Sequence, residues 1–299
     1  MHKVGFIGLG VMGRPMAACL LKKGCEVRGY DVNPDFPAQV EGLIPAGSVA
    51  EAVAEADFVI TMLPTKAICL ETALGPGGVA ETARPGTLVL EMSTTSASTV
   101  KELSAGYAQK GLSMLDAPVS GGPPIAAKGE MAIMVGGSKE DFDRARPLLS
   151  AMGKNVVHVG GIGAGTTIKM SNQVMGAINM VGVAEGLAMA AKAGVDPELV
   201  YQALEDGLAD SMALRIKGRK MLDRDFEPGA RIAIHMKDMV TVMEEAHKMN
   251  FPAPMSALVL EMMQSLTAMG LGDSDQASLV RIYEILGNVE VKSGTASTK

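Results

Sequence analysis

Lys169 and Asn172 stand one helical turn apart in an apolar stretch that opens on glycines, at residues 163–192. Residues at positions i and i+3 share one face of a helix, so an amine and a carboxamide are placed side by side. Because the amino end of a helix favours anions, a lysine there loses its proton more readily and suits general acid–base chemistry. The alternative is a solvated surface lysine, which the spacing alone favours.

Ser120, Gly121 and Gly122 form a second group that could bind a reactant. Two adjacent glycines after a serine expose successive backbone N–H groups beside a hydroxyl. That is the composition of a small anion nest, which suits a carboxylate. The alternative is a surface turn shaped by the prolines that precede and follow the segment.

The chain begins with elements that could hold a dinucleotide. A short apolar β run at 3–9 leads into the pattern G-x-G-x-x-G, and an apolar helical run follows. In this pattern Gly8 permits the tight turn, Gly10 lets the backbone approach a pyrophosphate, and Gly13 lets the helix lie close to the strand. The amino end of the helix then faces the phosphates.

Asp31 closes a second predicted strand, at 25–30. An acid at this place accepts hydrogen bonds from ribose hydroxyls. It also repels a 2′-phosphate, so the sequence favours NAD as the cofactor. NADP stays open because Arg28 is close in sequence. The structural alternative is that Asp31 caps a turn with Asn33-Pro34.

Strands and helices then alternate, which predicts a doubly wound, mostly parallel α/β sheet. Ligands of such sheets sit outside the carboxyl ends of the strands, so Pro64 and Thr94 are candidates for lining a nicotinamide site. Each hydroxyl near these ends could equally cap a helix, and the segment 93–96 has that composition. Further strands are predicted at 57–63, 87–91, 113–116, 131–135 and 155–159, and helices at 48–56, 66–74, 97–110 and 139–152.

The composition changes after residue 162, where strands stop and amphipathic helices run to the end. We therefore predict a first domain at 1–162 and an all-helical second domain at 163–299. Lys237, at the start of one of these helices, could reach back to the cofactor, and a plain exposed lysine is the alternative. The helices are predicted at 165–193, 196–206, 210–222, 236–249, 253–269 and 274–288.

The overall composition argues against several classes of protein. The 299 residues carry a net charge of −6 and only 3% aromatics without tryptophan, which does not suit a nucleic-acid surface. Three cysteines without paired or metal-type spacing indicate a reduced, cytoplasmic protein. We also expect no signal peptide, no membrane span and no metal site, since His235 has no partner at metal spacing.

Four separated motifs in the same order resemble the β-hydroxyacid dehydrogenases, the family related to 3-hydroxyisobutyrate dehydrogenase. They are FIGLGVMGRPMA near the start, DAPVSGG at 116–122, GAGTTIKMSNQ at 163–173 and HMKDM at 235–239. The resemblance covers almost the whole chain. Within the family, the stretch DRDFEPGARIAIHMKD is most similar to the tartronate semialdehyde reductase branch. Asp210 departs from that branch, which carries glycine there. Ser171 replaces the histidine of 6-phosphogluconate dehydrogenases, which makes decarboxylation less expected.

The resemblance implies a Rossmann domain joined by a long helix to a helical domain, often assembled as dimers or tetramers. It places the catalytic lysine on Lys169, the supporting asparagine on Asn172, and the substrate carboxylate on Ser120, Gly121 and Gly122. The cofactor contacts that it implies are Gly8, Leu9, Gly10, Val11, Met12, Gly13, Asp31, Val32, Asn33, Leu63, Pro64, Thr94 and Lys237.

The expected activity is reversible hydride transfer between NAD(H) and a small 3-hydroxy acid, most closely the conversion of tartronate semialdehyde to D-glycerate. Lys169 handles the proton, and no metal is needed. The same chemistry on 3-hydroxyisobutyrate, L-threonate or succinic semialdehyde is one alternative. A catalytically silent dinucleotide-binding protein is the other. The expected partners are this small substrate and further copies of the chain in a homodimer or homotetramer, without nucleic acid or membrane.

Overall fold

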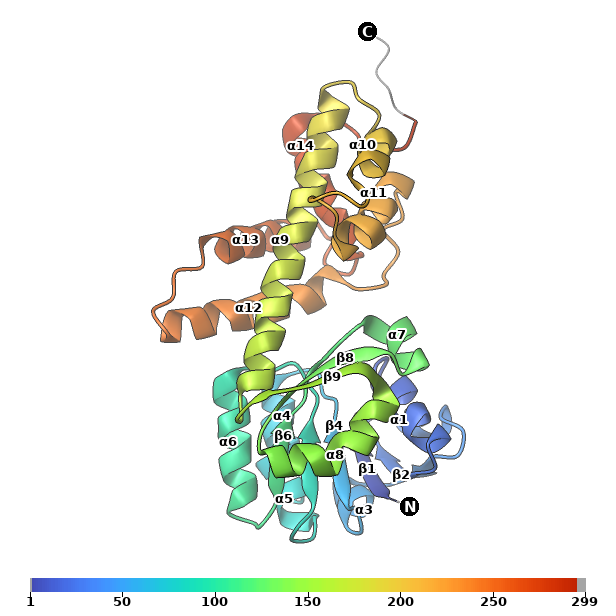
Figure 1. The fold of residues 1–299 in the computed structure, drawn as a ribbon, viewed down its shortest axis with the longest axis vertical. Coiled ribbons are helices and arrows are strands. Elements are labelled where there is room, and N and C mark those ends of the chain that lie inside the picture. Colours follow the sequence, from blue (N-terminus) through green and yellow to red (C-terminus); the bar gives the residue numbers. More distant parts are fainter. Residues whose placement is uncertain (1, 295–299) are drawn as a thin grey trace. The chain divides into compact units, whose positions relative to one another are not determined.

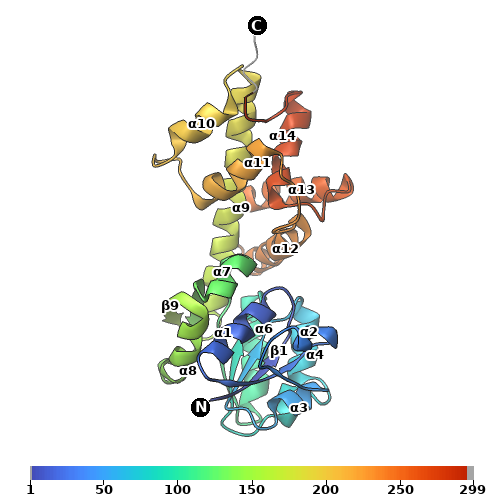
Figure 2. The same ribbon diagram turned by 90° about the vertical axis from the view of Figure 1, so that its right-hand side faces the viewer.

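The computed structural model describes residues 2–294 and divides into two compact units, Met1–Lys169 and Met170–Lys299. The division falls inside the long helix α9 (Ala164–Lys192). The sequence places the boundary at 162, just before this helix, where strand content ends. Figures 1 and 2 show α9 leaving the last strand of the first unit and continuing into the helices of the second.

The first unit is built on a twisted, mostly parallel sheet. Six of its strands follow the order β3-β2-β1-β4-β5-β6, which is the strand order of a dinucleotide-binding Rossmann sheet. The order reverses between β1 and β4, and the crevice at such a switch point is where ligands bind. The strands are β1 (Lys3–Ile7), β2 (Glu26–Tyr30), β3 (Ile44–Pro45), β4 (Phe58–Thr61), β5 (Leu88–Glu91) and β6 (Ser113–Asp116).

A second group of strands extends the sheet beyond β6. Strand β8 (Met131–Gly136) pairs antiparallel with β6 through Asp116 and Gly136 and with β7 (Val119–Ser120), and it pairs parallel with β9 (Gly153–Gly160). The chain leaves β9 directly into α9. The end of β6 therefore pairs with β8, and β8 pairs with the strand β9 that leads into the long helix.

Helices cover both faces of the sheet, because successive strand residues point to opposite faces (Figure 1). Phe58 and Ile60 of β4 pack in one core with α1 (Gly13–Lys22) and α8 (Lys139–Met152). Val59 between them packs in the other core. That second core contains side chains from α3 (Val49–Val53), α4 (Lys66–Leu74), α5 (Val79–Thr82) and α6 (Ala97–Ala108).

Several of these helices begin at a capping side chain. The hydroxyls of Ser48, Thr65, Ser96 and Ser138 each accept the backbone N–H three residues later, which satisfies one of the donors left free in a first helical turn. Ser48 caps the helix that the sequence predicts at 48–56. The Glu51 carboxylate accepts the N–H of Gly47, one residue earlier than in a standard capping box.

The second unit is helical and packs around α9. Ala177, Met180 and Val181 of α9 share one core with α12 (Ile232–Lys248) and α13 (Pro254–Ala268). Residues closer to its carboxyl end share another core with α10 (Pro197–Leu204), α11 (Arg219–Asp223) and α14 (Val280–Gly287). Figure 2 shows the same grouping along the helix. Although α9 is long and apolar enough to span a bilayer by length and composition, these packed side chains are those of a core helix.

The predicted elements agree with the structure except where local geometry departs from the regular helix. Residues 210–222 are predicted as one helix, but they form the π-helical turn η1 (Ala213–Gly218) followed by the short α11. Residues 274–288 open with the 3₁₀ turn η2 (Gln276–Leu279) before α14. Helix α12 begins at Ile232 instead of 236. The sequence does not predict α2 (Asp35–Ala38), α5, α7 (Gly122–Lys128), β3 or β7.

Candidate active site

The glycine loop after β1 has the geometry that the sequence predicts. Gly8 has φ of +94°, a conformation that side chains rarely adopt. A Cβ on Gly13 would overlap the carbonyl oxygen of Gly8, so only glycine lets α1 start against the loop. A Cβ on Gly10 would meet nothing within 4 Å. The backbone at Gly10 is therefore open on the side where a pyrophosphate would approach, and the loop fits a dinucleotide.

Asp31 connects the glycine loop to the end of β2. Its Oδ2 accepts the N–H of Leu9 at 2.6 Å, and its Oδ1 accepts the N–H of Asn33 at 2.9 Å. The second contact is the turn-capping role considered from sequence, and the first places the carboxylate directly beside the glycine loop. Val32 follows with its side chain 88% exposed. Both contacts leave the Asp31 carboxylate half-buried at the carboxyl edge of β2.

The segments after β4 and β5 lie side by side at the same edge of the sheet. The hydroxyl of Ser93 accepts the N–H of Leu63 at 2.8 Å and joins the two segments. Pro64 is exposed and Thr94 is half-buried. Thr65 and Ser96 cap the following helices, so the capping role considered for Thr94 belongs to Ser96.

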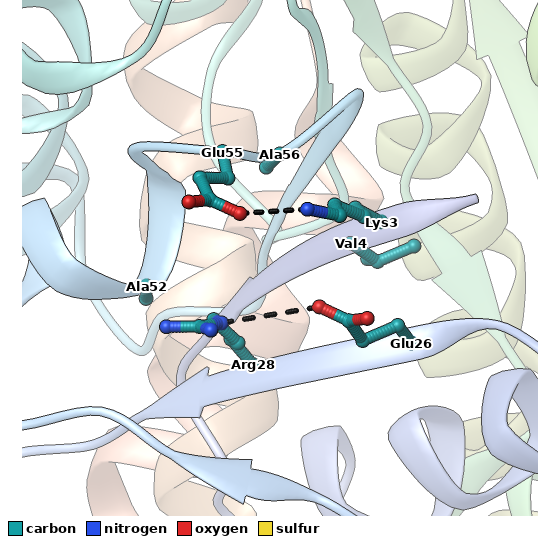
Figure 3. A pocket seen from close by; sticks show the side chains of 7 residues that line it. All are labelled: Lys3, Val4, Glu26, Arg28, Ala52, Glu55 and Ala56. Atoms are coloured by element: carbon teal, nitrogen blue, oxygen red, sulfur yellow. Dashed lines mark hydrogen bonds and ion pairs between the residues drawn. The ribbon is translucent and has the colours of Figure 1, made fainter. Parts of the chain in front are cut away.

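A small hollow at the amino ends of the strands, on the other side of the sheet from the glycine loop, is lined largely by charged side chains. It lies where β1 and β2 begin (Figure 3). The Lys3 Nζ is 2.6 Å from Glu55, and the Arg28 Nε is 4.0 Å from Glu26. The guanidinium of Arg28 is thus placed among carboxylates near the amino ends of the strands, which weakens the case for its binding a 2′-phosphate.

Two buried carboxyl groups, which the sequence analysis does not single out, end β5 and β6. Glu91 is 1% exposed and Asp116 is fully buried, and the two residues are register partners in adjacent strands. Burial raises the pKa of Glu91, against hydrogen bonds from Ser93 and Thr61. Burial also raises the pKa of Asp116, against hydrogen bonds from the N–H groups of Gly163 and Thr166. One signal in the sequence is that each acid ends an otherwise apolar strand.

Ser120 to Gly122 form the end of β7 and the beginning of α7. Ser120 pairs with Ala132 of β8 and is half-buried. Gly121 and Gly122 have φ of +146° and +71°, which explains why both are glycine. The segment is therefore not the simple proline turn considered as the alternative, because Pro123 and Pro124 occupy the first turn of a helix, where the missing N–H groups cost little.

Lys169 ends the first unit and is only 8% exposed. The solvated surface lysine considered from spacing alone is therefore wrong. The lysine lies in the second turn of α9, and the preceding turn is held by Asp116, whose two oxygens accept the N–H groups of Gly163 and Thr166 at 2.8 Å each. Lysines are seldom buried unless they are paired, and a buried amine in a nucleotide-binding unit is a candidate for acid–base chemistry.

Asn172 and Lys237 belong to the second unit, and other side chains connect them there. The Asn172 amide donates to Gln173 at 3.0 Å, the Gln173 amide donates to Asp238 at 2.6 Å, and Lys237 lies 3.2 Å from Asp238. His235 Nε2 is 3.2 Å from the carbonyl oxygen of Gln173. The sequence motifs contain Gln173 and Asp238 without indicating that they link the two predicted site residues.

Asp210, the departure noted in the sequence, is held by an ion pair. Its carboxylate accepts from Arg215 Nε at 2.9 Å, and Arg215 also binds Asp206 at 2.6 Å. These contacts lower the pKa of Asp210. Asp210 thus shares the positive charge of Arg215, which belongs to η1, with Asp206.

Within residues 2–294 there is no group of three His, Cys, Asp or Glu side chains arranged to hold a metal ion. Cys19 and Cys69 are buried and Cys25 is half-buried. The residue of this site that can transfer a proton is Lys169, whose buried amine belongs to the same unit as the glycine loop.

Comparison with known proteins agrees with this geometry. Residues 3–160 match the model of the NAD-binding domain of 6-phosphogluconate dehydrogenase, and residues 163–283 match the NAD-binding domain of NADP-dependent 3-hydroxyisobutyrate dehydrogenase. These matches confirm the Rossmann fold and the NAD-type cofactor.

The relatives align over nearly their whole length. A 2-(hydroxymethyl)glutarate dehydrogenase from Eubacterium barkeri is 35% identical over 98% of both chains. A 2-hydroxy-3-oxopropionate reductase from Escherichia coli is 36% identical over 96% of this chain and 98% of its own. The crystal structure of a 3-hydroxyisobutyrate dehydrogenase from Salmonella typhimurium superimposes with a TM-score of 0.84 at 32% identity, covering 93% of this chain and 99% of that one. The chain belongs to the β-hydroxyacid dehydrogenases, the family of NAD-dependent oxidoreductases related to 3-hydroxyisobutyrate dehydrogenase.

Proposed function

We propose that the protein interconverts tartronate semialdehyde and D-glycerate with NAD(H). The observation that carries the proposal is the burial of Lys169 in the unit that holds the glycine loop. The choice of substrate rests on the resemblance of the stretch at 223–238 and on the similar relative named 2-hydroxy-3-oxopropionate reductase. NAD is preferred to NADP because the Asp31 carboxylate lies beside the loop and repels a 2′-phosphate.

In this proposal, separate groups of residues in the first unit bind the dinucleotide and the substrate carboxylate. The glycine loop 8–13 and the segments around Asp31, Leu63-Pro64 and Thr94 hold the dinucleotide, whose nicotinamide supplies or accepts the hydride when bound. Ser120 and the N–H groups of Gly121 and Gly122 hold the substrate carboxylate. A carboxylate fixed in this way leaves the aldehyde carbon as the free, reacting end of a three-carbon acid.

Lys169 moves the proton. In reduction its ammonium group donates a proton to the aldehyde oxygen as that oxygen gains charge, and in oxidation the neutral amine removes the hydroxyl proton. General acid–base help of this kind is worth about 10²–10⁴-fold in rate. Asn172 orients the lysine or a substrate hydroxyl, and Lys237 contacts the cofactor. Each of these roles is part of the proposal.

We also propose that the enzyme is cytoplasmic and that it assembles with further copies of the chain. Free cysteines suit a reducing cytoplasm. Apolar side chains that are exposed in the helical unit, among them Met189, Met212 and Leu286, suit burial against another copy of the chain.

Steady-state rates on a substrate panel test the function. Tartronate semialdehyde and succinic semialdehyde are reduced with NADH and with NADPH. D-glycerate, 3-hydroxyisobutyrate, L-threonate and 2-(hydroxymethyl)glutarate are oxidised with NAD. We expect the highest kcat/KM for tartronate semialdehyde with NADH. A higher kcat/KM for another compound would support the same hydride-transfer chemistry but would show that tartronate semialdehyde is not the preferred substrate. Tight NADH binding without turnover on any compound would indicate a silent binding protein instead.

A further inference from the structure

The first turn of α9 has no cap of its own. Gly163, which precedes the helix, has no side chain and has φ of +92°. The N–H groups at such a helix start need acceptors from elsewhere. Asp116, which is 47 residues earlier at the end of β6, accepts the Gly163 N–H through Oδ1 and the Thr166 N–H through Oδ2, both at 2.8 Å. One buried carboxylate thus replaces both halves of a capping box.

The backbones around this contact leave no room for adjustment. A Cβ on Gly165 would lie 2.6 Å from the carbonyl oxygen of Asp116 and closer still to that of Met134. A Cβ on Gly136, the pairing partner of Asp116, would overlap the Asp116 carboxylate and lie 2.9 Å from the Gly165 nitrogen. The helix start is therefore held directly against β6 and β8.

Asp116 stands between two parts of the proposed site. It lies four residues before Ser120, and its partner Thr166 lies one turn before Lys169. On the basis of the proposed function, we propose that Asp116 is a positioning residue, which fixes the first turn of α9 and thereby aims Lys169 at a substrate held by the Ser120 loop. The reacting atoms themselves do not contact Asp116.

The first test is Asp116→Asn, with Asp57→Asn as the control. Asparagine keeps one acceptor and presents an amide donor to the other N–H. Asp57 makes a comparable bond, to the Lys3 N–H at 3.0 Å, at the amino edge of the sheet. We expect Asp116→Asn to lower kcat by roughly 10–100-fold, because small misplacements of a catalytic group are costly. The KM for NADH should stay near the wild-type value, and Asp57→Asn should match the wild type in both constants.

Two further readouts separate positioning from a general structural role. The primary kinetic isotope effect on kcat with 4-deuterated NADH should rise in Asp116→Asn, because chemistry becomes slower relative to product release. Amide hydrogen exchange should accelerate at 163–169 while exchange in β1 and β4 stays unchanged. A variant with wild-type kcat, or with wild-type protection at 163–169, would overturn the proposal.

A second variant covers the case in which Asp116→Asn does not fold. Gly165→Ala pushes the helix start away from the strands and leaves Asp116 intact, and Gly182→Ala on the same helix has open space around its Cβ. We expect Gly165→Ala to lose turnover and Gly182→Ala to retain it, and equal turnover in both would overturn the proposal. If the wild type reduces no semialdehyde, the proposed function fails together with the proposal that Asp116 positions Lys169 for it. The exchange measurement still decides separately whether Asp116 anchors α9.

Discussion

Asp31 has a structural contact and a proposed recognition role at the same carboxylate. Its two oxygens hold the N–H groups of Leu9 and Asn33, and the same charge is proposed to bind the ribose and to repel a 2′-phosphate. Such a residue is visible in sequence because it closes a strand at a fixed distance from a glycine loop. Its hydrogen bond to Leu9 becomes visible only when the strands are paired.

We predict that Asp31→Asn lowers the preference for NADH over NADPH. A hydrogen bond to a charged group contributes about 1.5–3 kcal/mol, so NADH affinity should fall roughly 10–100-fold. NADPH affinity should fall less or rise, because asparagine no longer repels the 2′-phosphate. Fluorescence titration with both cofactors measures the ratio, with Asp35→Asn at the exposed start of α2 as the control. An unchanged ratio of the two affinities would remove Asp31 from cofactor selection.

Glu91 should make stability depend on pH. Burial raises its pKa above the ordinary value of 4.5, so the folded state binds the proton more tightly than the unfolded state. The stability that results is complete below the ordinary pKa and is lost as the pH rises through the raised pKa. Glutamine in its place stays neutral at every pH and keeps an oxygen for the Ser93 N–H.

We therefore predict that the thermal midpoint of Glu91→Gln, relative to wild type, increases as the pH rises above the ordinary glutamate pKa of 4.5. Thermal unfolding followed by circular dichroism at several pH values gives this difference. Glu102→Gln, at an exposed position of α6, should show no such trend. A difference that is flat or falls with pH would mean that Glu91 ionises as easily in the folded state as in the unfolded one.

At the scale of elements, the glycine loop offers a matched pair of substitutions. Gly13→Ala would press a Cβ against the Gly8 carbonyl, whereas Gly10→Ala has open space on the protein side. We expect Gly13→Ala to destabilise the first unit by about 1–3 kcal/mol through overpacking. Gly10→Ala should keep the wild-type thermal midpoint and lose NADH affinity, because its methyl group meets only the pyrophosphate. Wild-type NADH affinity in Gly10→Ala would contradict the proposed place of the pyrophosphate.

Most of the sheet could be predicted because its strands are short apolar runs with clear endings. The elements that the sequence does not predict are those that break local rules. Pro123 and Pro124 indicate a turn, yet they occupy the first turn of α7, where proline is tolerated. The two-residue strands β3 and β7 have no periodicity of their own and exist through pairing with β2 and β8.

The candidate site could be predicted only in part for the same reason. Motifs identify Lys169, Asn172 and the glycine loop, because each has a characteristic local pattern. Asp116 bonds to the start of α9 across as many as 50 residues, and the link from Asn172 through Gln173 to Asp238 spans 65 residues at its longest step. Such contacts depend on tertiary packing, so local spacing does not indicate them.

At the scale of the whole molecule, we propose that the chain self-associates through the helical unit. Met189, Met212 and Leu286 of this unit are each more than 60% exposed, and assembly would remove such side chains from water. We predict a mass in solution of two or four times the 31.0 kDa chain. Light scattering coupled to size-exclusion chromatography measures it, and a mass of one chain over a range of concentrations would contradict the proposed assembly.

The most direct test of the account is turnover of Lys169→Ala alongside its affinity for NADH. Lys192→Ala, an exposed lysine at the other end of α9, is the control. We predict that Lys169→Ala binds NADH as the wild type does and loses about 10²–10⁴-fold in kcat, with partial recovery when a small primary amine is added. Turnover near the wild-type rate in Lys169→Ala would contradict the assignment of the proton donor and acceptor.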